Sequence, residues 1–158
     1  MASYLTPEDA QEYADERLNA EAWDDAVDED GSSFGQPGTL TYKALAMATK
    51  IIDRLNYRGD KYDSGQENQF PRGTDTTVPT DIEEACFEIA LALLDGIDPQ
   101  LEGENLRMKS QGYANVRSTY DSDMPAPHMV AGVPSLVAWR YLVPYLRDVG
   151  MVDMLRTS

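Results

Sequence analysis

The sequence predicts a mainly α-helical protein: a bundle of about four helices with a small extended or hairpin element and a C-terminal arm. Apolar residues recur at helical spacing in several segments, and residues that favour helix starts or stops flank those segments. With 158 residues, 42% of them hydrophobic, the chain is long enough to bury one core without disulfides. Its single cysteine is typical of a protein made in a reducing compartment, and its N-terminus does not resemble a signal peptide.

The first helix is predicted to begin near Thr6. Thr6 can cap the helix, Pro7 suits the first helical position, and two acidic residues follow where the helix end is positive. The apolar stripe predicted for this helix is Ala10, Tyr13, Ala14 and Leu18. We expect a short second helix through Trp23, followed by a loop over residues 28–39, which contain three glycines and a proline.

Two longer helices carry broad apolar faces. One is predicted over about residues 41–56, with a core face made of Ala44, Leu45, Ala48, Ile51, Ile52 and Leu55. The other begins at Thr80, which can form a capping box with Glu83, and it stops at Gly96. Its predicted core face is Ile82, Ala85, Cys86, Ile89, Ala90, Leu93 and Leu94. Together these helices can form an antiparallel bundle.

The connection over residues 57–79 is long for a compact domain and has no clear periodicity, so it is predicted to be either a working surface or disordered. Phe70 and Pro71 indicate that part of it is held against the bundle or a neighbouring subunit. We assign residues 1–132 to the bundle, including this connection and an extended segment over 107–121 whose residues alternate as in a strand.

Residues 133–158 are predicted to form a C-terminal helix and docking arm. The helix begins near Pro134, and Pro144 should kink or end it. Its aromatic residues Trp139, Tyr141 and Tyr145 either anchor a partner, since aromatics dominate interface energetics, or cover the helical core. Apolar residues also occur in the final segment, which we expect to become ordered on docking to a partner.

Charge is the strongest compositional signal. The net charge is −15, and residues 1–30 contain eleven acidic residues against Arg17 alone. Proteins that bind nucleic acid gain affinity by placing lysine and arginine on phosphates, and this chain repels a polyanion on average. Solubility alone is the simplest explanation of such a surface, and an acidic mimic of DNA is a further alternative.

No catalytic, metal or cofactor site is predicted, so the chain is expected not to be an enzyme. The acidic run before Gly31 resembles part of a calcium-binding loop, but its first and twelfth positions are Ala26 and Pro37. His128 is the single histidine, and Cys86 is predicted to be a small buried residue on a helix face.

One segment could bind single-stranded DNA by stacking bases on aromatic rings beside positive charge. Its residues fall within sixteen positions and are interrupted by acidic side chains: Tyr57, Arg58, Lys61, Tyr62, Phe70 and Arg72.

The order of several motifs resembles a family of small tailed-phage proteins. The resemblance includes ALAMATKIIDRLNYRGDKYDSGQENQFPRG, which contains a Gln-rich motif ending in Phe70, Pro71 and Arg72, and then VPTDIEEACFEIALALLDG. Later SQGYANVRSTYD and VPSLVAWRYLVPYL follow, so that the similarity spans about residues 4–148. The family is that of head–tail connector, or neck, proteins, and similar phage sequences carry the label of DnaT-like single-stranded-DNA-binding proteins.

The resemblance implies a homo-oligomeric ring of twelve copies at the head–tail junction of the virion, made in the host cytoplasm. It implies a portal protein above the ring, a tail or nozzle protein below it, DNA passing through without specific binding, and no cofactor or membrane. The resemblance also implies that arms of such adaptors dock into grooves of the portal. The partner-binding residues expected here are Phe70, Pro71, Arg72, Trp139, Tyr141, Tyr145, Met151 and Leu155.

Overall fold

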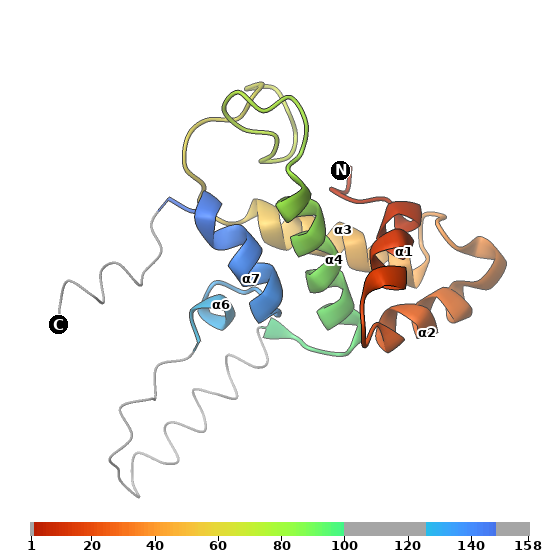
Figure 1. Ribbon diagram of the computed structural model, residues 1–158. Helices are drawn as coiled ribbons and strands as arrows, with labels where there is room; N and C mark the ends of the chain where they lie inside the picture. Colours follow the sequence, from red (N-terminus) through yellow and green to blue (C-terminus); the bar gives the residue numbers. More distant parts are fainter. Residues whose placement is uncertain (1, 100–125, 148–158) are drawn as a thin grey trace, which may run out of the picture.

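Helices α3 (Leu40–Asp53) and α4 (Thr80–Leu94) form the centre of the fold and pack against each other (Figure 1). Helices α1 (Pro7–Glu16) and α2 (Glu21–Asp30) lie on one side of this pair, and α6 (Pro127–Val130) and α7 (Leu136–Leu142) lie on the other (Figure 1). Two 3₁₀ turns, η1 (Gly31–Ser33) and η2 (Val143–Tyr145), follow α2 and α7.

This computed structural model describes residues 2–99 and 126–147, and within them it contains six α-helices and no strand. The predicted mainly α fold class is therefore confirmed. The extended segment predicted over 107–121 lies outside the described residues. No helix in the described ranges is both long and apolar enough to cross a bilayer.

The core forms where α4 meets its neighbours. Phe87 of α4 makes an edge-to-face contact with Trp23 of α2, with ring centroids 5.5 Å apart. The indole of Trp23 is fully buried, and its Nε1 donates a hydrogen bond to Gln11 Oε1 at 3.0 Å, so this polar group is satisfied. The large side chains buried most completely come from five parts of the chain: Trp23, Leu45, Ile52, Ile82, Phe87, Ile89, Val133 and Leu142.

The N-terminal helices differ from the prediction at their ends. The cap at Thr6 is confirmed, because its Oγ1 accepts a hydrogen bond from the Asp9 amide at 3.1 Å. However, α1 ends at Glu16, so Leu18 lies beyond the helix and is 83% exposed, and its predicted place in the apolar stripe is wrong. The second helix continues through Asp30, so the prediction that residues 28–30 belong to a loop is also wrong.

Asp30 explains how α3 begins. Thr39 makes no side-chain cap, and the Asp30 carboxylate accepts instead from the amides of Leu40 and Thr41, at 2.7 and 3.0 Å, and from the Thr41 hydroxyl at 2.7 Å. Burial acts to raise the pKa of Asp30, but these hydrogen bonds outweigh it and the pKa is lowered. The acid that suggested a calcium loop is thus a cap supplied from another helix.

Replacing Asp30 with alanine should lower the free energy of unfolding by about 1–2 kcal/mol at neutral pH, the usual value of a lost helix cap. Because the folded-state pKa lies below the unfolded value, the contribution is fully present above the unfolded pKa. It disappears as the pH falls through the folded pKa. Urea denaturation at pH 7 and near pH 2 would measure this, and the exposed Asp28→Ala is the control. Equal destabilisation at both pH values would contradict the capping role.

Helix α4 begins at Thr80 as predicted, but its N-cap differs from the prediction. Pro79 is its N-cap and has an extended backbone, and the amides of Ile82 and Glu83 donate to the Pro79 carbonyl. Thr80 is therefore the first helical residue and makes no capping bond, so the predicted capping box is wrong. The predicted stop is confirmed, since α4 ends at Leu94 and Gly96 has a φ of 87°, which favours glycine.

The C-terminal helix ends where proline was expected to end it. The α-helix stops at Leu142, and the chain continues through Pro144 as the 3₁₀ turn η2. The backbone then pairs with residues 56–58, where the connection begins, through bonds from the Arg58 amide to the Tyr145 carbonyl and from the Arg147 amide to the Asn56 carbonyl. The final segment, with Met151 and Leu155, lies outside the described residues.

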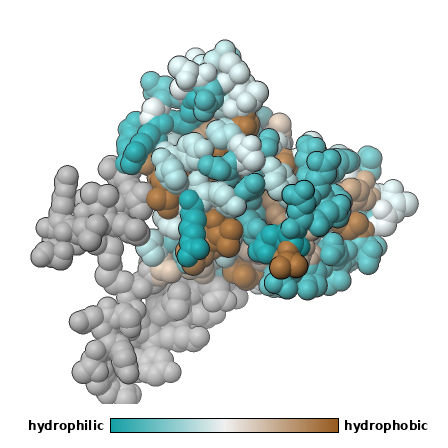
Figure 2. All heavy atoms as spheres, viewed as in Figure 1, coloured by the Kyte–Doolittle hydropathy of each residue, from teal (hydrophilic) through white to brown (hydrophobic). Residues whose placement is uncertain are grey.

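The surface is mostly polar on the side that carries α1 and α2. All ten acidic residues of these helices other than Asp30 are exposed. Figure 2 shows this side as largely hydrophilic, with a small hydrophobic patch standing out from it. The negative charge that dominates the N-terminal sequence is therefore carried by exposed side chains of α1 and α2.

Candidate functional site

The connection over residues 57–79, called here the 57–79 loop, is held by an aromatic cluster centred on Phe70. The Phe70 ring makes edge-to-face contacts with Tyr57, Tyr145 and Tyr4, at centroid distances of 4.7, 5.5 and 6.1 Å. Phe70 is only 3% exposed. It therefore fixes the loop against the N-terminal segment and η2 of its own subunit.

The N-terminal residues contribute to this support, which sequence reasoning missed. The Tyr4 hydroxyl donates to Asp53 Oδ1 and accepts from the Phe70 amide at 3.2 Å. Burial and the hydrogen bond to Asp53 raise the pKa of Tyr4, so the hydroxyl remains a donor. Asn68 also donates to the Ala2 carbonyl, at 2.7 Å. Two segments more than sixty positions apart are thus tied together, and no local pattern reveals such a contact.

Arg72 is engaged inside the loop. Its guanidinium donates to the carbonyls of Arg58 and Gly59 and to both oxygens of Gln69, and it lies 5.7 Å from the centre of the Tyr57 ring. A guanidinium with these partners joins both arms of the loop. It has few donors left for a phosphate or another protein.

The residues around Pro71 form further hydrogen bonds inside the 57–79 loop. The Pro71 carbonyl accepts from the Tyr62 amide at 3.0 Å and from Gln66 Nε2 at 2.8 Å. The Lys61 ammonium donates to the Gln66 carbonyl at 3.2 Å. The Gln-rich motif therefore builds a loop with its own hydrogen-bond network, in place of a flexible connection.

These contacts change the interpretation of the predicted DNA-binding segment. Tyr57 and Phe70 are each 3% exposed, so neither ring can stack on a base without unfolding the loop. Arg58 donates to the Leu146 carbonyl at 2.7 Å, which engages another of the cations. Of the three aromatic residues in that segment, Tyr62 alone presents its ring to solvent, at 53% exposure.

The predicted aromatic anchors of the C-terminal helix lie against α4 and the 57–79 loop. Trp139 is 8% exposed and belongs to the core. A hydrogen bond with Glu84, together with burial, raises the pKa of Tyr141 to about 12. The Tyr145 hydroxyl donates to Asp81 at 3.2 Å, and burial raises its pKa. The structure thus brings Phe70 and Tyr145 together, and it uses all three aromatics within the subunit.

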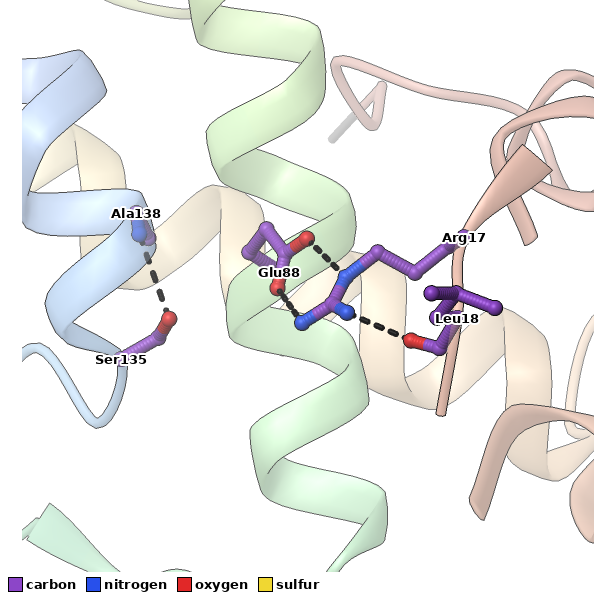
Figure 3. Close-up of polar contacts among 5 residues, drawn as sticks. All are labelled: Arg17, Leu18, Glu88, Ser135 and Ala138. Carbon is purple, nitrogen blue, oxygen red and sulfur yellow. Dashed lines mark hydrogen bonds and ion pairs between the residues drawn. The ribbon is translucent and has the colours of Figure 1, made fainter. Parts of the chain in front are cut away.

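An exposed turn between α1 and α2 is a surface that the sequence did not predict. Arg17 donates to both carboxylate oxygens of Glu88, at 2.5 and 3.1 Å, and to the Leu18 carbonyl at 2.6 Å (Figure 3). The hydrogen bond to Glu88 raises the pKa of Arg17. Asn19 has a φ of 61°, which turns the chain toward α2. The α1–α2 turn (residues 17–20) therefore presents Leu18 on a fixed backbone.

A groove lies between α3, the C-terminal end of α4 and residues 131–132. Its volume is about 720 Å³. The charged residues that line it are Lys43, Lys50, Arg54 and Asp98, so cations outnumber acids in a chain whose net charge is −15. Its apolar lining includes Leu40, Ala44, Met47, Ile51, Leu93 and Leu94. We call this feature the α3–α4 groove.

The potential metal ligands do not gather. Within residues 2–99 and 126–147, no group of three or more His, Cys, Asp or Glu side chains could hold an ion. Cys86 is fully buried as predicted, and burial raises the pKa of its thiol to about 11. Burial lowers the pKa of His128.

Comparison with known proteins gives one result. Neither the curated proteins nor the solved structures contain a significant match to this chain. A family model described as "Putative DnaT-like ssDNA binding protein" matches residues 1–142, which include all six α-helices of the described ranges. The chain therefore belongs to this DnaT-like family.

Proposed function

We propose that the protein is a structural head–tail adaptor of a tailed bacteriophage, forming a ring that binds the portal, extends the DNA channel and docks the tail. The observation that carries this proposal is the 57–79 loop. It contains the Gln-rich motif on which the phage resemblance rests, and its aromatic and cationic side chains hold the loop within the subunit. A loop that is already ordered is suited to binding another protein, because it loses little conformational entropy on binding.

The charge of the surface supports the same proposal. The ten exposed carboxylates on α1 and α2 repel phosphate groups, so a channel with this character lets DNA slide without adsorbing. The portal above the ring and a tail protein below it are the expected partners.

Binding of single-stranded DNA is the second candidate, because the family description names it. The exposed ring of Tyr62 is the feature that favours it. The burial of Tyr57 and Phe70 argues against binding of single-stranded DNA. Of the three aromatic rings in the loop, Tyr62 alone is left for a base to stack on.

We expect a fluorescent oligodeoxythymidine to show no saturable binding to the protein in an anisotropy titration, at low or near-physiological salt. A true binder would lose affinity steeply with salt, since it releases counterions from the phosphates. The control is Tyr62→Ala, which should behave as the wild type does. Saturable, salt-dependent binding that Tyr62→Ala removes would favour the second candidate over the adaptor.

The adaptor role is tested directly by electron microscopy of the protein mixed with the portal protein of its phage. The expected result is extra density in ring form on the tail-facing side of the portal. Absence of any complex, with both proteins folded and in excess, would contradict the proposed function.

A further inference from the structure

We propose that the α1–α2 turn of one copy docks into the α3–α4 groove of the next copy, with Leu18 entering the apolar part of the groove. The acidic residues that flank Leu18 then face the cations at the groove's rim. This inference rests on the proposed function and deepens it, because it names the contact that joins neighbouring copies in the ring.

The turn has the features of a docking element. Leu18 is the most exposed of the large hydrophobic residues in the described part of the chain, at 83%. The backbone that carries it is fixed by the Arg17 bonds to Glu88 and to the Leu18 carbonyl (Figure 3). A side chain presented on a rigid turn loses little backbone entropy on binding. The flanking Asp15, Glu16 and Glu21 are all exposed.

The groove offers the complementary chemistry. Met47, 52% exposed, lines it together with leucine and isoleucine side chains, which can cover an incoming leucine. Lys50 and Arg54 are exposed at its rim, and within the described ranges neither side chain makes a hydrogen bond or ion pair. Lys43 lies near Asp30 and adds to the hydrogen bonds that lower the pKa of that acid. An apolar site with free cations fits an apolar side chain flanked by carboxylates.

The two surfaces belong to different faces of the subunit. The α1–α2 turn is tied to Glu88 on α4, whereas the groove uses Leu93 and Leu94 of the same helix. At about 100° per residue, these leucines lie about 120–140° away from Glu88 around the helix axis. A subunit therefore cannot fill its own groove with its own turn. The contact joins unlike surfaces of two copies, and repetition of such a contact produces a ring or a filament.

Cysteine cross-linking tests this contact. The native Cys86 is buried with a raised pKa, so it does not compete with cysteines introduced at the surface. Full-length Leu18→Cys and Met47→Cys, carrying tags of different size, are mixed at high concentration in moderate salt and oxidised. The matched control pairs Leu18→Cys with Val137→Cys, because Val137 is 40% exposed on α7 and outside the groove.

The Leu18→Cys and Met47→Cys pair is expected to form a mixed disulfide at least about tenfold faster than the control pair, because docking raises the effective concentration of the two thiols. Equal rates for the two pairs, or products dominated by like-with-like dimers, would overturn the proposal and leave the groove to another occupant. The same mixture, examined with the portal protein by electron microscopy, distinguishes failure of the turn–groove contact from failure of the adaptor role. Ring density on the portal without the selective cross-link rejects this contact alone, whereas no portal complex rejects the adaptor role.

Discussion

Replacing Phe70 with alanine is expected to lower the free energy of unfolding by about 3–5 kcal/mol, as for other fully buried phenylalanines. The ring is 3% exposed and touches three tyrosines from the N-terminal segment, the loop and η2. Its removal leaves a cavity where these three parts of the chain meet. Urea denaturation followed by circular dichroism measures the change, and an unaltered midpoint would show that Phe70 does not hold the loop.

Two further variants make this measurement specific. Tyr62→Ala alters an exposed ring in the same loop and should change the stability by less than about 0.5 kcal/mol. Phe70→Leu keeps much of the buried volume and should recover a large part of the lost stability. If Tyr62→Ala is as damaging as Phe70→Ala, the loop depends on its surface and not on the aromatic cluster.

The parts of the fold that the sequence predicted well are those governed by local pattern. Helices α3 and α4 carry apolar residues at helical spacing over about four turns, and the residues predicted for their core faces are all buried or packed against the core. The prediction missed other buried residues of these helices, including Phe87 and Leu91. The errors lie at helix ends, where the cap comes from elsewhere. Asp30 caps α3 from ten positions away, and Pro79 starts α4 before the threonine that was expected to cap it. Such partners are set by tertiary contacts.

The candidate site was harder to predict for the same reason. The sequence marked Phe70 and Pro71 as residues that fix the loop. It could not show that the Phe70 amide donates to the Tyr4 hydroxyl, which in turn donates to Asp53. Leu18 was assigned to the core because its spacing continues the α1 stripe, and the helix ends two residues before it. The groove is lined by residues from α3, α4 and residues 131–132. The periodicity of one segment cannot show which other segments pack beside it.

The N-terminal charge has two consequences if the copies associate as proposed. Uniform repulsion between chains of net charge −15 opposes association at low salt, while the cations of the groove attract the acidic turn of a neighbour. Association in solution should therefore be weak and strongest at intermediate salt, where the long-range repulsion is screened. Close ion pairs at a partly buried contact are screened less.

Reversing the two free cations of the groove, with Lys50→Glu and Arg54→Glu in one chain, should weaken association between copies by about 1–3 kcal/mol, or roughly 5- to 150-fold. Both residues are exposed and line the groove, so the change turns two attractions into repulsions with little effect on folding. Sedimentation velocity over a range of concentrations measures the effect. Arg140→Glu with Arg147→Glu is the matched control, since both residues are exposed outside the groove and the net charge changes equally.

A compensating variant turns this loss into a test of which surfaces meet. Asp15→Lys with Glu16→Lys reverses the charge beside Leu18, so these chains should also fail to associate with one another. Mixed with the Lys50→Glu, Arg54→Glu chains, they can alternate, because every contact then joins a basic surface to an acidic one. The mixture should sediment as larger species than either variant alone. Recovery in the mixture cannot come from a general change in net charge or stability, because each component retains its own defect. A mixture that sediments as the sum of its components would show that the α1–α2 turn and the groove do not meet.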